Sequence, residues 1–157
     1  MNPGEKHMTY NALARQAVSL LRATRNPVSN AANLAALIYD SLTEINWVGF
    51  YFVHGDELMV GPFQGKPACV RIPVGQGVCG TAVSSRRVQR VADVEAFDGH
   101  IVCDTESRSE IVVPLIQAEE VIGVLDVDSP RLDRFDETDQ AGMEKLAAIY
   151  LDSIAPK

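Results

Sequence analysis

The feature that most constrains the fold is a change in the spacing of apolar residues at Trp47. Before it, apolar side chains recur at helical spacing in two stripes within residues 13–45. After it, residues 47–53 are aromatic and β-branched, which is typical of a strand, and a Gly-containing turn leads into a second strand over residues 57–64. Helical spacing returns only near the end of the chain, over residues 143–154.

Turn and cap residues set the expected boundaries of these elements. Asn26-Pro27 is predicted to end the first helix, Ser29 to cap the second, and Asp136 to cap the last. The remaining elements are expected as strands over residues 70–72, 88–91, 110–117 and 120–128, and a short helix over residues 78–86. Hairpins combined with terminal helices predict an α+β fold, in which helices pack on one face of an antiparallel sheet and long loops cover the other.

Composition and charge narrow the function. The 157 residues are expected to form one domain, with residues 1–7 as a disordered N-terminal extension, and 46% hydrophobic residues exclude a disordered chain. A net charge of −7 argues against nucleic acid and anionic membranes as partners, because both attract basic surfaces. No apolar run approaches the ~20 residues of a membrane span, and the N-terminus has no stretch of the signal-peptide type. We therefore expect a cytoplasmic protein.

Three cysteines, Cys69, Cys79 and Cys103, stand out in or beside the loop segments. Their odd number does not fit a secreted disulfide framework, which leaves packing, metal binding or redox chemistry. His100 lies close enough to Cys103 to suggest zinc. Structural zinc sites, however, draw on two short chelating pairs, and ten residues separate Cys69 from Cys79.

A glycine motif lies between the first two cysteines. Gly75, Gly77 and Gly80 match G-x-G-x-x-G, the dinucleotide-binding pattern. That pattern must follow a parallel strand and open a βαβ unit, whereas here it follows Pro73 in a broken stretch. Tight turning is the better interpretation of these glycines.

Two strand patterns indicate a ligand pocket. Asp126 and Asp128 are two residues apart on a predicted strand, so their carboxylates share one face, although taken alone they are better explained by an acidic strand end in solvent. Trp47 and Tyr51 share a face of another strand with Gly49 between them. Taken alone the aromatics fit core packing, but a gap at Gly49 would make room for a small apolar group.

Together these residues resemble a known family. The motifs that carry the resemblance are GPFQGKPAC (61–69), PVGQGVCG (73–80), GHIVCD (99–104), SEI (109–111) and GVLDVDSP (123–130). They are similar to those of the free methionine-(R)-sulfoxide reductases, which are small GAF-domain enzymes. The resemblance implies a GAF-like fold and reduction of free L-methionine-(R)-sulfoxide to methionine, with no cofactor and no metal.

The resemblance also implies roles for the thiols. Cys103 attacks the sulfoxide sulfur and becomes a sulfenic acid, which Cys69 converts to an intramolecular disulfide. Cys79 has an auxiliary role. Thioredoxin is the implied reductant, and a homodimer is the implied assembly.

Further residues are carried into the pocket by the same resemblance. Trp47 and Tyr51 form its wall, while Glu110, Asp126 and Asp128 bind substrate and supply the proton that the leaving oxygen needs. Three enclosed carboxylates cannot all ionise cheaply, so one should have a raised pKa, and Glu110 and Asp128 are both candidates for the proton donor. Two alternatives remain open: a GAF module that senses a small molecule without catalysis, and a thiol protein that consumes peroxide.

Overall fold

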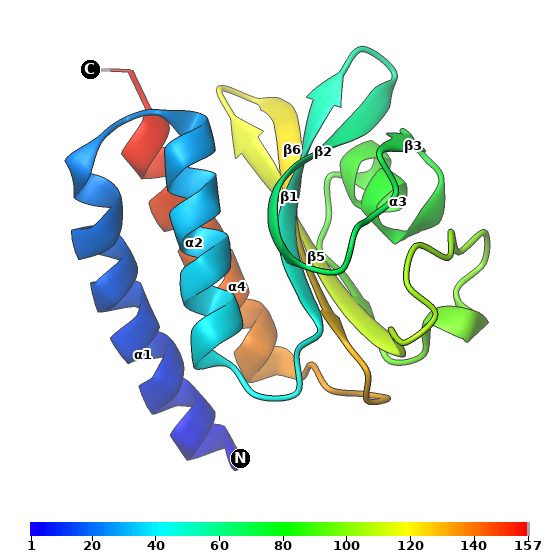
Figure 1. Cartoon of the computed structure of the whole chain (residues 1–157), viewed down its shortest axis with the longest axis horizontal. Coiled ribbons are helices and arrows are strands. Elements are labelled where there is room, and N and C mark those ends of the chain that lie inside the picture. The colour runs from blue at the N-terminus through cyan, green and yellow to red at the C-terminus, as the bar shows by residue number, and fades with distance from the viewer. Residues whose placement is uncertain (157) are drawn as a thin grey trace.

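The described residues form a sheet of six strands in the order β3-β2-β1-β6-β5-β4, and each strand is antiparallel to its neighbours. The sheet separates a larger layer of helices from a smaller layer of loops (Figure 1). The computed structural model describes residues 1–156. Helices α1, α2 and α4 cover one face, while α3 and the long loops cover the other (Figure 1). The elements are α1 (Pro3–Leu20), η1 (Leu21–Ala23), α2 (Pro27–Ser41), β1 (Trp47–His54), β2 (Glu57–Gly65), β3 (Arg71–Pro73), α3 (Gly77–Ser85), β4 (Gln89–Val91), η2 (Val94–Ala96), β5 (Ser109–Gln117), β6 (Glu120–Ser129) and α4 (Glu137–Ile154). The predicted α+β arrangement is confirmed.

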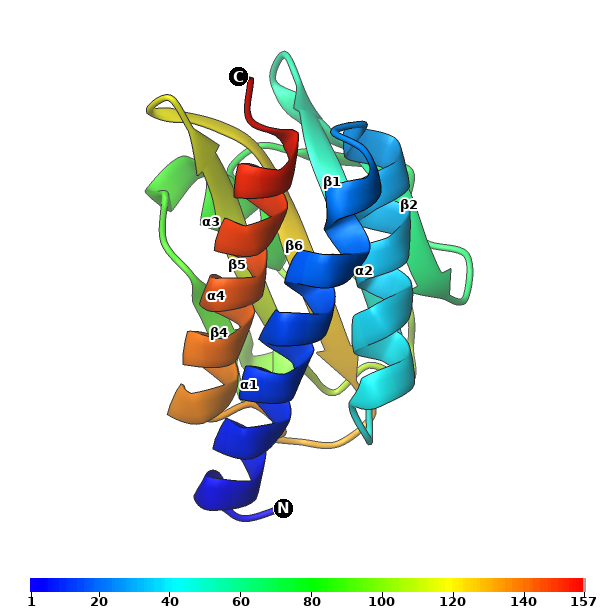
Figure 2. The same cartoon turned by 90° about the vertical axis from the view of Figure 1, so that its left-hand side faces the viewer.

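The helical face holds the larger core. Helix α2 packs on β1 and β2, α4 packs on β5, and α1 lies outside them against α2 and α4 (Figure 2). Leu34 and Ile38 of α2 and Met143 of α4 are fully buried against Phe50 and Leu125 of the sheet. Burial of large apolar side chains contributes about 1.5–3 kcal/mol each, so this layer stabilises the sheet that carries the pocket on its other face.

Two helix boundaries differ from those predicted. Helix α2 begins at Pro27, not after Ser29, because the Asn26 side chain accepts hydrogen bonds from the backbone N–H groups of Val28 and Ser29. Proline fits the first helical position, where its missing N–H leaves no bond unmade. Pro27 therefore opens the second helix, and the first already ends at Leu20. The Asp136 cap of α4 is confirmed, since its side chain accepts from the N–H of Asp139.

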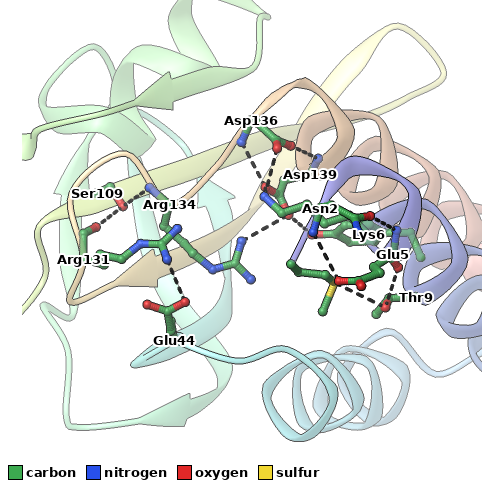
Figure 3. Close-up of polar contacts among 12 residues, drawn as sticks. Asn2, Glu5, Lys6, Thr9, Glu44, Ser109, Arg131, Arg134, Asp136 and Asp139 are labelled. Carbon is green, nitrogen blue, oxygen red and sulfur yellow. Dashed lines mark hydrogen bonds and ion pairs between the residues drawn. The ribbon is translucent and has the colours of Figure 1, made fainter.

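The N-terminus also differs from the expected extension. Residues 3–7 form the first turns of α1, which Asn2 caps, and Lys6 is buried (Figure 3). Asp139 is fully buried and accepts hydrogen bonds from Lys6 Nζ at 2.7 Å, Tyr10 Oη at 2.7 Å and Arg134 Nη1 at 3.3 Å. Burial opposes ionisation of the neighbouring Asp136. Hydrogen bonds from the Asp139 backbone N–H and from Lys6 outweigh this effect and lower the pKa of Asp136 to about 2. Charge pairing therefore fixes α1 to α4.

The opposite face carries a second core beneath the loops. The predicted hairpins are confirmed as β1–β2 and β5–β6, and the short helix is confirmed as α3. Loops over residues 66–70 and 97–108 lie on this side, with Leu58, Val78 and Val124 buried below them. None of the helices within residues 1–156 combines the length and the hydropathy that a membrane span requires.

Candidate active site

Strand register brings the predicted acids together. Trp47 pairs with Asp128, which pairs with Glu110, so these three residues form one row across β1, β6 and β5. Asp126 lies in the next row on the same face, opposite Gly49. Because side chains alternate along a strand, all of them point toward α3 and the loops and away from the helical layer.

Seven of the eight predicted site residues line a single cavity of about 50 Å³. Helix α3 contributes Cys79, and the loop before β5 contributes Cys103. The full lining is Trp47, Tyr51, Pro67, Ala68, Ile72, Gly77, Val78, Cys79, His100, Ile101, Cys103, Asp104, Ser107, Glu110, Asp126 and Asp128. Cys69, the eighth, lies beside the cavity and is bonded to Cys103, which lines it.

The bond between Cys69 and Cys103 is a disulfide. It links loops 34 residues apart in sequence, with 5.3 Å between the two Cα atoms. Cys79 is buried and free of disulfide bonds. The zinc alternative therefore loses two of its candidate sulfur ligands, because Cys69 and Cys103 are bonded to each other. His100 does line the cavity, but burial lowers the pKa of its imidazole and favours the neutral form.

The aromatic wall differs in detail from the prediction. The Trp47 ring lies directly over Gly49, and a Cβ at this glycine would overlap both the ring and the Phe63 side chain. Gly49 therefore makes room for the indole, not for a ligand. Phe63 stacks on Trp47 at 5.2 Å between ring centroids, and the Tyr51 ring is tilted against the Trp47 ring at 5.8 Å.

Both aromatic residues also hold the loop that carries Cys69. Trp47 Nε1 donates a hydrogen bond to the Lys66 carbonyl at 3.1 Å, and the Tyr51 hydroxyl donates to the Cys69 carbonyl at 3.0 Å. Polar atoms on otherwise apolar rings usually find partners when buried. The wall of the cavity and the position of one disulfide cysteine are thus coupled through two hydrogen bonds.

Glu110, Asp126 and Asp128 form the acidic floor of the cavity, and burial determines their electrostatics. Removal from water raises the pKa of Glu110, Asp126 and Asp128 well above the usual range, and each carboxylate raises the pKa of a neighbour further. Burial, reinforced by the charge of Asp126, also raises the pKa of the Cys79 thiol. A floor of this kind favours protonation of at least one carboxyl group.

Two carboxylate oxygens on the floor lack partners. Asp126 Oδ1 and Asp128 Oδ1 are buried and accept no hydrogen bond from the protein. Three atoms lie within 4.8 Å of one another, namely the Cys79 sulfur, one oxygen of Asp126 and one oxygen of Glu110. A cation can bridge this spacing. Buried acceptors without donors favour a ligand that brings positive charge and N–H groups.

The glycine motif turns the chain, as predicted. Gly75 and Gly77 have φ values of +89° and +65°, and a Cβ at Gly80 would overlap the Pro73 carbonyl. The turn starts α3 close above the sheet, which places Cys79 over the acids. The dinucleotide interpretation is not supported, because the short β3 before the motif is antiparallel to its neighbour.

Asn46 is a further residue beside the site that no sequence pattern indicated. Its Nδ2 atom donates to Ser107 Oγ at 3.1 Å and to Asp104 Oδ2 at 3.3 Å, and both acceptors belong to the loop that follows Cys103. Its backbone N–H also donates to the Asp128 carbonyl. A single asparagine before an aromatic strand carries no distinctive signal in sequence.

Comparison with known proteins places the chain among relatives with the same architecture. Residues 29–154 match the GAF domain family. The chain is 52% identical over 139 residues to the free methionine-R-sulfoxide reductase of Escherichia coli, covering 88% of this chain and 84% of the relative. Among solved structures it is similar to fRMsr of Staphylococcus aureus in complex with substrate (51% identity, TM-score 0.89, 93% and 95% coverage). It is also similar to the free methionine-R-sulfoxide reductase of Neisseria meningitidis in complex with its substrate (44% identity, TM-score 0.92, 95% and 90% coverage).

Proposed function

The chain belongs to the GAF-domain family of free methionine-R-sulfoxide reductases, and on that premise we propose the following course for its reduction of free L-methionine-(R)-sulfoxide to methionine. The observation that carries the proposal is the Cys69–Cys103 disulfide beside a cavity with an acidic floor. We further propose that residues 1–157 form one such domain, since α1, which precedes the matched residues, packs on α4.

Cys103 is the attacking thiol in this scheme. Its thiolate attacks the sulfoxide sulfur while the sulfoxide oxygen takes up a proton. The resulting hydroxyl group then moves from the substrate sulfur to the Cys103 sulfur as the transient S–S bond breaks, so methionine leaves and Cys103 becomes a sulfenic acid. The Cys69 thiol then attacks that sulfenic acid, a disulfide forms, and water departs. Cys103 lines the cavity and Cys69 lies beside it, which supports this division of roles. The two thiols supply both electrons, so the scheme uses no prosthetic group and no metal.

The proton comes from the acidic floor. The departing oxygen needs a general acid, and a carboxyl group whose pKa is raised by burial holds a proton at the pH where the enzyme works. Glu110 and Asp128 are neighbours in one row across β5 and β6 and are the two candidate donors.

The substrate's other groups match the rest of the cavity. Its α-ammonium is placed against Asp126 and Asp128, whose buried oxygens need donors. Its S-methyl group is placed against Trp47 and Tyr51, where an aromatic face favours the partial positive charge that develops at sulfur. Cys79 keeps its auxiliary place as a buried neutral thiol beside Asp126.

Thioredoxin is proposed as the reductant that returns the disulfide to two thiols. An enzyme that must be re-reduced after every turnover fits a reducing compartment, so we assign it to the cytoplasm. A homodimer is the proposed assembly, which sedimentation analysis tests as a mass of two chains.

The decisive experiment supplies dithiothreitol and racemic free methionine sulfoxide and then resolves the remaining epimers. We expect multiple turnovers that consume only the R epimer, because inversion at sulfur exchanges oxygen and methyl between the acidic floor and the aromatic wall. Binding of methionine without turnover would indicate a sensing module. Consumption of hydrogen peroxide in place of sulfoxide would indicate a different thiol chemistry.

A further inference from the structure

Exposed valines adjoin both cysteines of the disulfide. Val70 follows Cys69 and is 56% exposed, and Val102 precedes Cys103 and is 62% exposed. The other large apolar side chains that are exposed within residues 1–156 lie at the N-terminus, on α1 and α2, or in the segment between β6 and α4. On the described loops that hold the disulfide, Val70 and Val102 are therefore the exposed large aliphatic side chains.

The disulfide itself keeps the two valines close. The Cα atoms of Cys69 and Cys103 are 5.3 Å apart, and each valine is one residue away. With about 3.8 Å between consecutive Cα atoms, the Cα atoms of Val70 and Val102 are at most about 13 Å apart. This spacing is short enough for one small protein to contact both residues beside the disulfide.

The same two loops also carry a polar contact. Lys66 Nζ and Glu106 Oε2 form an exposed ion pair at 3.0 Å, and it connects the loop of Cys69 with the loop of Cys103. An apolar centre with a polar rim is the usual composition of a protein interface. Interfaces between redox partners are small and transient, so two apolar side chains are a large share of such a contact.

We propose that Val70 and Val102 form the docking surface for a small protein dithiol reductase of the thioredoxin type. The proposal rests on the disulfide cycle of the proposed function. A thiolate of the docked partner attacks one sulfur of the Cys69–Cys103 bond, which gives a mixed disulfide and releases the other cysteine as a thiolate. The partner's second thiol then breaks the mixed disulfide, so the partner leaves oxidised and this chain regains both thiols.

The test measures reduction of the oxidised protein directly, without sulfoxide. Thioredoxin or dithiothreitol is added in separate arms, and the appearance of free thiols gives a second-order rate constant for each. We expect Val70→Ser and Val102→Ser each to lower the thioredoxin rate constant about three- to tenfold, because each loses apolar contact with the partner. The dithiothreitol rate constant should stay unchanged. Val70→Thr and Val102→Thr, which keep the shape, should give smaller losses.

Val28→Ser is the matched control, because Val28 is 61% exposed but lies on α2, on the opposite face of the sheet. It should leave both rate constants unchanged. Wild-type thioredoxin rates in the Val70→Ser/Val102→Ser double variant would overturn the proposal. Equal losses with thioredoxin and dithiothreitol would also overturn it, since the valines would then act on the disulfide and not on docking. Methionine release is scored separately, so failure of the proposed reaction stays distinct from failure of the docking surface.

Discussion

Removal of the substrate's α-ammonium is the perturbation to which this cavity should respond most strongly. Acetylation of the amine removes the positive charge and leaves one N–H donor where there were three. The structure offers two buried acceptors, Asp126 Oδ1 and Asp128 Oδ1, that no protein group satisfies. The free amino acid can satisfy both, and the acetylated compound cannot.

The magnitude follows from those two oxygens. A hydrogen bond to a buried charged group contributes about 1.5–3 kcal/mol, and an acceptor left unpaired costs a similar amount. Loss of one such bond together with the favourable charge gives about 3 kcal/mol, which corresponds to a loss of about a hundredfold in kcat/KM. We therefore expect N-acetyl-methionine-(R)-sulfoxide to be reduced at least about a hundredfold more slowly than the free compound.

Acetylation also adds bulk to a cavity of about 50 Å³, so the assay needs analogues that separate size from charge. 4-(Methylsulfinyl)butanoic acid removes the ammonium without adding atoms, and N-methyl-methionine sulfoxide adds bulk while it keeps the charge. Methionine or the corresponding sulfide is quantified with dithiothreitol as reductant. The butanoic acid should be as poor a substrate as the acetylated compound, and the N-methyl compound should be clearly better than either.

Asp126→Asn completes the test. This variant should slow reduction of the free amino acid much more than that of the butanoic acid, because only the first substrate uses the carboxylate. Comparable rates for the free and acetylated compounds in the wild type would refute the reasoning, even with Cys103 proven catalytic. An Asp126→Asn variant that slows both substrates equally would also contradict it.

Three further sets of variants test the thiols, the acids and the scaffold. Cys103→Ser should abolish reduction in the methionine assay, whereas Cys69→Ser should release about one methionine per subunit and then stall with thioredoxin, since its sulfenic acid lacks a partner. Glu110→Gln and Asp128→Asn should each lower kcat/KM more than tenfold, within the 10²–10⁴ range for a lost general acid at whichever is the donor. The donor must be protonated and burial raises its pKa, so wild-type activity falls as pH rises through that pKa, and only the donor's variant should lose this alkaline limb of the pH–rate profile. Asp139→Asn should reduce the free energy of unfolding in urea by about 3–5 kcal/mol, because it leaves the buried Arg134 without its charge partner and Lys6 with only the half-exposed Asp136; an unchanged midpoint would argue against that network.

The sequence could predict the strands and the shared face of the aspartates. The alternation of side chains along a strand is local, so the sequence places Asp126 and Asp128 on one side wherever that strand lies. It failed at the start of α2, where Asn26 and Ser29 are both residues that cap helices, and Pro27 decides between them. It also failed at the N-terminus, where α1 is held by an ion pair between Lys6 and Asp139, 133 residues away.

At the candidate site, the difference between what local sequence predicts and what tertiary structure decides is larger. The sequence alone supplied the residue types, namely the three cysteines, the acids and the aromatic pair, and local patterns indicated which of them share a face. Only the tertiary structure decided that Cys69 and Cys103 meet across 34 residues, that the Trp47 ring occupies the space over Gly49, and that the floor is buried. The physical reason is that side-chain direction depends on the backbone within one strand. Strand register, loop closure and the desolvation that raises a carboxyl pKa depend on residues distant in sequence, and these are set only when the layers pack.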